Sequence, residues 1–166
     1  MKMKDHVYNV LFICTGNSAR SILAESLVDH WGGGRFKGYS AGSFPKGAVH
    51  PYALDLLQSL QLPSEGMRSK RWDEFAKPGA PVMDLVVTVC DNAAGEICPV
   101  WPGHPITGHW GVEDPSQFQG SDEQKSREFI RVARILKRRI ESLAGLPVEK
   151  VDRIALARQI DEIGRS

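Results

Sequence analysis

Cys14 and Arg20 are separated by five small or polar residues, a spacing that could bind a tetrahedral oxyanion and attack it. The guanidinium of an arginine offers a planar fork to such an anion. A turn that points backbone N–H groups inward, followed by the positive end of a helix, adds to the attraction. The same field is expected to lower the pKa of the Cys14 thiol and to favour the nucleophilic thiolate. We therefore predict Cys14 as the nucleophile of an oxyanion loop whose residues are Thr15, Gly16, Asn17, Ser18, Ala19, Arg20 and Ser21.

Two further cysteines, Cys90 and Cys98, complete a low and odd count of three. Such a count argues against a disulfide-stapled secreted chain and favours reactive thiols in a reducing compartment. Their spacing matches no standard zinc ligand pattern, so we predict no metal site. Eight residues of helix would separate Cys90 from Cys98 by about 12 Å. A disulfide needs Cα atoms within about 7 Å, so residues 90–98 must form a loop, or unwind on oxidation, for these two thiols to pair.

Asp114 is the strongest candidate for a general acid, because Pro115 restricts the backbone beside it and biases it towards an extended conformation. A carboxylic acid aimed into the loop could protonate an oxygen that leaves the anion. An isolated Asp-Pro pair is usually only a turn, and that alternative stays open on the residues alone.

The two strongest apolar runs, over residues 7–13 and 85–89, predict buried parallel strands. Cys14 and Cys90 each follow one of these runs, and a helical apolar pattern begins after Arg20. The alternative for the first segment is an ordinary polar turn with a buried cysteine and a surface arginine. Its position between an apolar strand and an amphipathic helix favours the anion site. In parallel sheets such sites lie beyond the carboxyl ends of the strands, so both cysteines should share one edge.

The remaining elements complete an α/β pattern of alternating strands and helices, which implies a parallel sheet with helices on both faces. Further strands are predicted over residues 36–42 and 106–110. Ser121 and Gln124 form a capping box before a helix with a clean apolar stripe, whose charged face is expected to be solvated. Leu146-Pro147 ends that helix. Other helical segments are predicted over residues 50–60, 73–76 and 148–163, and residues 91–105 are expected to be mainly loop.

The chain of 166 residues has the size of one domain, and its formal net charge is only +1. That balance argues against binding nucleic acid through bulk charge. No apolar run approaches the ~18–20 residues of a membrane span, and the charged start does not resemble a signal peptide. We therefore expect a cytoplasmic protein with no membrane contact. We assign residues 1–146 to a single domain and residues 147–166 to a helical extension.

A resemblance to a known family rests on the segment from Val10 to Ser21, VLFICTGNSARS. It resembles the phosphate loop of the low-molecular-weight protein-tyrosine-phosphatase superfamily. The segments 39–42, 84–90 and 109–115 narrow the resemblance to the arsenate reductases built on that fold, of the thioredoxin-coupled type. The resemblance covers residues 7–144. It implies a three-layer α/β fold like phosphotyrosine phosphatase I, with a central, mainly four-stranded parallel sheet.

The resemblance also implies an activity, the reduction of arsenate to arsenite in arsenic detoxification. It implies an order of thiols in which Cys14 is the nucleophile, Cys90 the relay and Cys98 the terminal disulfide partner. The expected ligand is arsenate, with phosphate or sulfate as a mimic, and no cofactor is expected. An external thiol reductant such as thioredoxin, or glutaredoxin with glutathione, would reduce the final disulfide.

Three features of the sequence depart from the pattern of these relatives. Ala19 stands where many carry another cysteine, and the gap between Cys90 and Cys98 is slightly longer than in the best matches. Some relatives bind potassium through the counterparts of Asn17 and Glu25 with an acidic segment. That segment reads Arg68-Ser69-Lys70 here, so we predict no potassium site.

Two other functions remain open. A phosphotyrosine phosphatase acting through a cysteinyl-phosphate would need only the loop and an acid, and a weak activity of this kind is expected in any case. It is disfavoured because none of the tyrosines, Tyr8, Tyr39 and Tyr52, neighbours Asp114. The third function is a non-catalytic oxyanion or thiol sensor whose last helix docks a partner.

Overall fold

A computed structural model of the chain describes residues 6–90 and 101–166. Its centre is a four-stranded sheet in the order β2-β1-β3-β4. Each neighbouring pair of strands is parallel, which confirms the predicted α/β class. The strands are β1 (Tyr8–Cys14), β2 (Phe36–Gly42), β3 (Leu85–Thr88) and β4 (Ile106–His109).

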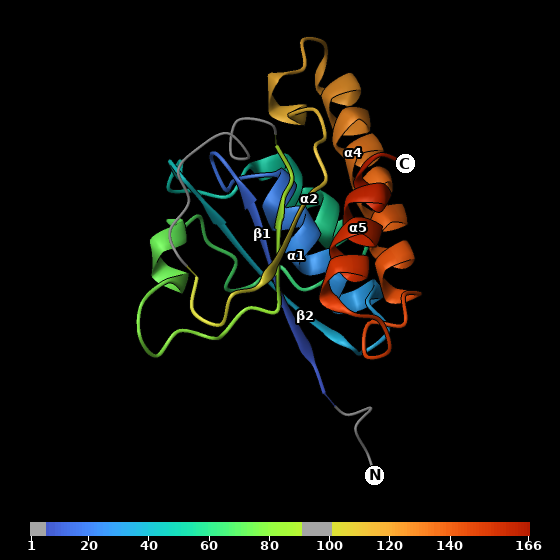
Figure 1. Cartoon of the computed structure of the whole chain (residues 1–166). Coiled ribbons are helices and arrows are strands. Elements are labelled where there is room, and N and C mark those ends of the chain that lie inside the picture. Colours follow the sequence, from blue (N-terminus) through green and yellow to red (C-terminus); the bar gives the residue numbers. More distant parts are fainter. Residues whose placement is uncertain (1–5, 91–100) are drawn as a thin grey trace.

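The long helices gather on one face of the sheet (Figure 1). They are α1 (Arg20–Trp31), α2 (Pro51–Ser59), α4 (Asp122–Ala144) and α5 (Arg153–Gly164). Gly38 of β2 faces α1, because a Cβ there would lie 2.6 Å from a methyl of Val28. Gly108 of β4 faces α5 in the same way, with Ile160 at 2.5 Å. Both glycines therefore allow a helix to approach the backbone of the sheet closely.

The opposite face carries only short helical structure among the described residues. The 3₁₀ helix η2 (Trp72–Phe75) packs there, and its Phe75 ring lies 5.7 Å from the ring of Tyr39 in β2. A second 3₁₀ turn, η3 (Pro115–Gln117), follows Asp114 near the start of α4. We expected helices on both faces of the sheet. Among the described residues, this second face carries the 3₁₀ helix η2 and irregular chain instead of a long helix.

The buried core lies between the sheet and the helices, where Phe12, Phe129 and Leu136 are among the largest side chains hidden from solvent. The capping box predicted at Ser121 and Gln124 is present and starts α4. One expectation about this helix is wrong. Arg139 does not share the solvated face, because only 7% of its surface is exposed.

The last helix begins later than its apolar pattern predicted. α5 starts at Arg153 rather than near Val148, because the side chain of Asp152 caps it by accepting a hydrogen bond from the Ala155 N–H at 2.8 Å. Residues 147–150 form a turn instead. Within the two described ranges, no helix is both long and apolar enough to cross a membrane.

Replacing Gly164 with alanine tests how tightly α5 packs on β4. A Cβ at this position would lie 2.0 Å from the carbonyl oxygen of His109 and 2.8 Å from Trp110 Cδ1. We expect Gly164→Ala to lower the free energy of unfolding by about 1–3 kcal/mol, measured by urea denaturation. Gly145→Ala is the matched control, because its Cβ would meet no described atom closer than 3.6 Å. Equal stability of the two variants would contradict the close contact.

Candidate active site

The loop between β1 and α1 turns sharply at Asn17, whose φ of 44° lies in the left-handed region. Its carbonyl groups point outward and are held by neighbouring segments. The Thr15 oxygen accepts from the Phe44 N–H at 2.9 Å, and the Gly16 oxygen accepts from the Lys46 N–H at 2.9 Å. Because these carbonyl groups turn away, the N–H groups of the loop can face the cysteines, and those of Thr15 and Asn17 donate to sulfur atoms.

A directed chain of hydrogen bonds ends on the sulfur of Cys14. The Lys70 N–H donates to Asn17 Oδ1 at 2.8 Å, so the other end of that amide, Nδ2, must be a donor. It donates to Ser21 Oγ at 2.7 Å. Ser21 Oγ lies 2.9 Å from Cys14 Sγ, where it accepts from the neutral thiol or donates to the thiolate. The Asn17 N–H also donates to this sulfur, at 3.2 Å.

The protonation state of Cys14 differs from the expectation drawn from the sequence. Burial raises the pKa of the thiol, while the hydrogen bond from Ser21 and the charge of Arg20 lower it without cancelling that effect. Only 2% of the residue is exposed. The expectation of a lowered pKa is therefore wrong, because a buried thiolate loses its hydration.

Arg20 turns towards the segment that follows β4. Its Nη1 donates to the Val112 carbonyl oxygen at 3.0 Å, and its Nη2 lies 3.4 Å from Asp114 Oδ2. The other carboxylate oxygen of Asp114 accepts from the N–H and the hydroxyl of Ser116. Asp114 therefore presents Oδ2 to the arginine and holds Oδ1 away from it.

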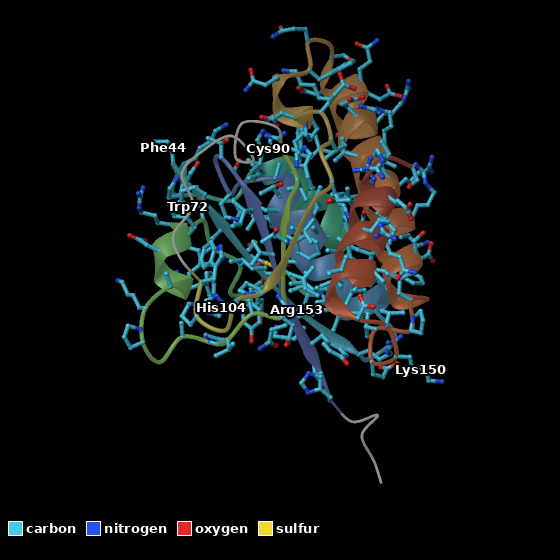
Figure 2. The ribbon with its side chains drawn as sticks, viewed as in Figure 1. Phe44, Trp72, Cys90, His104, Lys150 and Arg153 are labelled. Atoms are coloured by element: carbon cyan, nitrogen blue, oxygen red, sulfur yellow. The ribbon has the colours of Figure 1, made fainter. Side chains whose placement is uncertain are left out.

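Cys90 lies against the same loop, at the end of the sheet where Phe44 also sits (Figure 2). The Thr15 N–H donates to Cys90 Sγ at 3.2 Å. Both thiols, Cys14 and Cys90, are free and buried, and both line one cavity of about 620 Å³. Arg20 and Asp114 line it as well, so the structure brings together four of the five residues predicted as catalytic. The fifth, Cys98, lies outside the described residues.

The predicted loop residues divide between the cavity and its support. Thr15, Gly16, Ser18 and Ala19 line the cavity with Arg20, whereas Asn17 and Ser21 are fully buried behind it. The residues that line the cavity can therefore offer their backbone to an anion, while the buried side chains of Asn17 and Ser21 hold the loop in place through hydrogen bonds.

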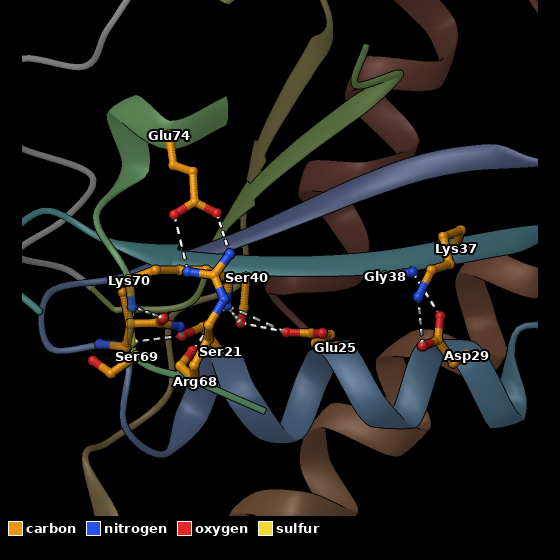
Figure 3. A network of polar contacts seen from close by, with 12 residues as sticks. Ser21, Glu25, Asp29, Lys37, Gly38, Ser40, Arg68, Ser69, Lys70 and Glu74 are labelled. Atoms are coloured by element: carbon orange, nitrogen blue, oxygen red, sulfur yellow. Dashed lines mark hydrogen bonds and ion pairs between the residues drawn. The ribbon is translucent and has the colours of Figure 1, made fainter. Parts of the chain in front are cut away.

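The side chain of Lys70 lies behind the loop, and only 9% of it is exposed. Its Nζ is 3.3 Å from Ser40 Oγ and 3.9 Å from Glu25 Oε1 (Figure 3). Burial raises the pKa of Glu25 and lowers that of Lys70, and the attraction between them opposes both changes. The lysine therefore supplies a positive charge beside Glu25. That potassium does not bind there stays a prediction.

Sequence reasoning missed several residues that complete the cavity. Phe44, Lys46 and Gln117 line it, and Phe44 is 67% exposed at its mouth. The stem of Lys46 covers Gly16, where a Cβ would lie 3.2 Å from Lys46 Cε. No periodic pattern marks these residues, because they come from irregular segments that only the fold brings together. In the described part of the chain, no three His, Cys, Asp or Glu side chains cluster as metal ligands would.

Comparisons with known proteins agree with this geometry. A model of the family "Low molecular weight phosphotyrosine protein phosphatase" matches residues 9–157. An arsenate reductase of Halalkalibacterium halodurans is 36% identical to the chain, over 81% of the chain and 94% of the relative.

Two solved structures are similar as well. One is an arsenate reductase from Archaeoglobus fulgidus, with 31% identity, a TM-score of 0.63, and coverage of 82% of this chain and 99% of that one. The other is a thioredoxin-dependent arsenate reductase from Corynebacterium glutamicum, with 26% identity and a TM-score of 0.54. That match covers 82% of this chain and 63% of the other.

The raised pKa of Cys14 predicts how its alkylation depends on pH. Because the neutral thiol is favoured, we expect the rate of reaction with iodoacetamide to rise through pH values above those of an exposed cysteine. Ser21→Ala removes a hydrogen bond that lowers this pKa and should move the midpoint to higher pH. The rate at Cys14 is measured by mass spectrometry of the labelled peptide, with Cys14→Ser as the blank. A rate already at its plateau at pH 7 would contradict this account.

Proposed function

Because the chain belongs to the low molecular weight phosphotyrosine protein phosphatase family, we propose that it is an arsenate reductase whose loop binds arsenate. The observation that carries the proposal is the placement of two thiols in one oxyanion cavity. Cys90 Sγ accepts a hydrogen bond from Thr15, the residue next to the nucleophile Cys14. Hydrolysis of a phosphate ester needs one thiol, whereas reduction needs two, and the second is present.

The first step forms a bond between the Cys14 sulfur and arsenic. Arsenate carries negative charge into a cradle of N–H groups, and Arg20 adds a bidentate contact. The anion competes with Asp114 for the guanidinium 3.4 Å away, which frees the carboxyl group to face the ligand. As the sulfur–arsenic bond forms, the Asp114 carboxylate takes the proton of the Cys14 thiol and passes it to the arsenate hydroxyl, which leaves arsenic as water.

The second step transfers two electrons to arsenic. The Cys90 thiolate attacks the Cys14 sulfur, and the sulfur–arsenic bond breaks with its electron pair left on arsenic. Arsenic(V) becomes arsenic(III), arsenite leaves, and the two cysteines form a disulfide. The electron count balances, because two thiols are oxidised for each arsenate reduced.

The third step regenerates the nucleophile. Cys98 attacks the Cys90 sulfur, Cys14 leaves as a thiolate, and the disulfide moves to Cys90 and Cys98. An external dithiol protein such as thioredoxin, or glutaredoxin with glutathione, then reduces it. This chemistry needs a reducing compartment, so we place the protein in the cytoplasm, where it would remove arsenate. We assign the chemistry to the domain of residues 1–146 and treat residues 147–166 as an extension of it.

Serine variants of the two later cysteines test the relay. We expect Cys90→Ser and Cys98→Ser to lose multiple-turnover production of arsenite by at least about 100-fold, because each removes a thiol that the cycle consumes. Arsenite is measured with a thioredoxin system and separately with a glutaredoxin and glutathione system. Inorganic phosphate should still bind to both variants. Full turnover in both would refute the relay, while full turnover in Cys98→Ser alone would assign the last step to a small external thiol.

A phosphatase activity is the second candidate, and the volume of the cavity favours it. About 620 Å³ is far larger than a tetrahedral oxyanion, and an exposed aromatic ring, Phe44, stands at the mouth. An aryl phosphate would therefore fit with its phosphate in the loop.

The two activities separate at Cys90. Hydrolysis of p-nitrophenyl phosphate proceeds through Cys14, Arg20 and Asp114, so Cys90→Ser should keep it within about threefold while losing arsenate reduction. Cys14→Ser should abolish both and serves as the control. If Cys90→Ser loses hydrolysis as completely as reduction, the separation of roles is wrong.

A further inference from the structure

Residues 109–114, which we call the acid arm, leave the edge strand β4 and form one wall of the cavity. Four of these residues, Gly111, Val112, Glu113 and Asp114, line it in succession. The acid arm makes two contacts with Arg20, through the Val112 carbonyl oxygen and the Asp114 carboxylate. The position of the arm therefore sets the positions of both the arginine and the acid.

On its inner side the acid arm is tied to β3. The Trp110 N–H donates to the Thr88 oxygen at 2.7 Å, and the Val112 N–H donates to the Val89 oxygen at 3.1 Å. These bonds connect the arm to the strand that leads to Cys90. They leave its outer side to be held by other elements, because within the described residues β4 is the edge strand of the sheet.

Helix α5 holds the outer side of the acid arm. The Asp161 carboxylate accepts a hydrogen bond from the His109 N–H at 3.1 Å. The indole N–H of Trp110, a fully buried side chain, donates to the Ile160 oxygen at 2.9 Å. Gly164 lets the end of the helix touch the His109 carbonyl group. An edge strand that would otherwise expose its polar groups is thus covered by a helix.

Arg139 ties the acid arm to the helices from within the core. Its Nη1 donates to the oxygens of Trp110 at 3.0 Å and Gly111 at 3.1 Å, and its Nη2 reaches the Ser166 oxygen at 3.4 Å. None of the ion pairs within the described ranges includes this guanidinium. A buried guanidinium with no carboxylate side chain beside it is expensive, so the three backbone oxygens that it contacts must offset its lost hydration.

We propose that Arg139 and α5 are positioning elements of the active site, which hold the acid arm so that Arg20 and Asp114 face the oxyanion loop. Arg139 joins three segments: α4, the acid arm and Ser166, beyond the end of α5. Loss of this tie leaves the Trp110 and Gly111 carbonyl groups without their charged donor, and the arm then depends on its two bonds to β3 and on α5. The resulting mobility weakens the contact of Arg20 with the Val112 oxygen. The proposal rests on the roles proposed above for Arg20 and Asp114.

Equilibrium binding of inorganic phosphate tests this proposal without requiring turnover. Titration calorimetry on folded protein should show a dissociation constant about tenfold higher for Arg139→Gln than for the unmodified chain, because Arg20 is no longer held. Arg139→Lys keeps the charge and one donor group and should recover part of the affinity. Asp161→Ala should weaken binding about threefold, while Asp161→Asn, which keeps the acceptor oxygen, should not.

Arg35→Gln is the matched control. Arg35 also donates to backbone oxygens at the end of a helix, those of Ala144 and Leu146, but it lies away from the acid arm. A loss of stability alone would affect this variant without changing phosphate affinity. If Arg139→Gln does not fold, the comparison of Asp161→Ala with Asp161→Asn carries the test.

A second measurement tests whether Asp114 still acts as the general acid. The ratio of kcat/KM for phenyl phosphate to that for p-nitrophenyl phosphate should fall in Arg139→Gln, because the poorer leaving group depends more on Asp114. Asp114→Asn sets the lower limit of this ratio. Unchanged phosphate affinity in the folded Arg139 and Asp161 variants would overturn the positioning role. If the unmodified chain itself binds no phosphate, the proposed function fails instead, and the positioning role fails with it.

Discussion

The left-handed backbone at Asn17 is the constraint on which the rest of the site depends. A residue other than glycine adopts this conformation at a cost, and asparagine is among those that tolerate it best. Here two hydrogen bonds of the Asn17 side chain hold the conformation. Its amide oxygen accepts from the Lys70 N–H, and its amide nitrogen donates to Ser21 Oγ. Gly42 permits the arrangement, since a Cβ there would lie 2.5 Å from the Thr15 oxygen. Without this turn, the N–H groups of the loop would not converge on one anion.

Three neighbouring strands end beside that turn, and each delivers a different part of the proposed chemistry. β1 ends at Cys14, the proposed nucleophile, β3 leads to Cys90, and β4 leads to the acid arm. Parallel strands place their carboxyl ends on one edge, so groups about 75 and 100 residues away from Cys14 in sequence meet in one cavity. Side chains behind this edge support it: Glu25 of α1 with Lys70 beside β2, and Arg139 of α4 beside the acid arm.

Three cationic side chains lie around the loop, and each makes a different kind of contact. Arg20 faces the cavity, Lys70 lies beside Glu25, and Arg139 holds carbonyl groups. Around the nucleophile itself, burial outweighs this charge, and the pKa of the Cys14 thiol rises. The positive charge of Arg20 therefore lowers the pKa of Cys14 without overcoming the cost of burying a thiolate.

The sequence by itself determined the sheet, the loop and most of its residues. Apolar runs, a capping box and the Cys-x5-Arg spacing depend on neighbours along the chain, and each is present at the predicted place within a few residues. Local patterns could not show that Arg139 is buried, that α5 begins at Arg153, or that Phe44 stands at the mouth of the cavity. Nor could they show the direction of the pKa shift at Cys14. Those features depend on which distant groups exclude water from a side chain, and only the tertiary structure brings such groups together.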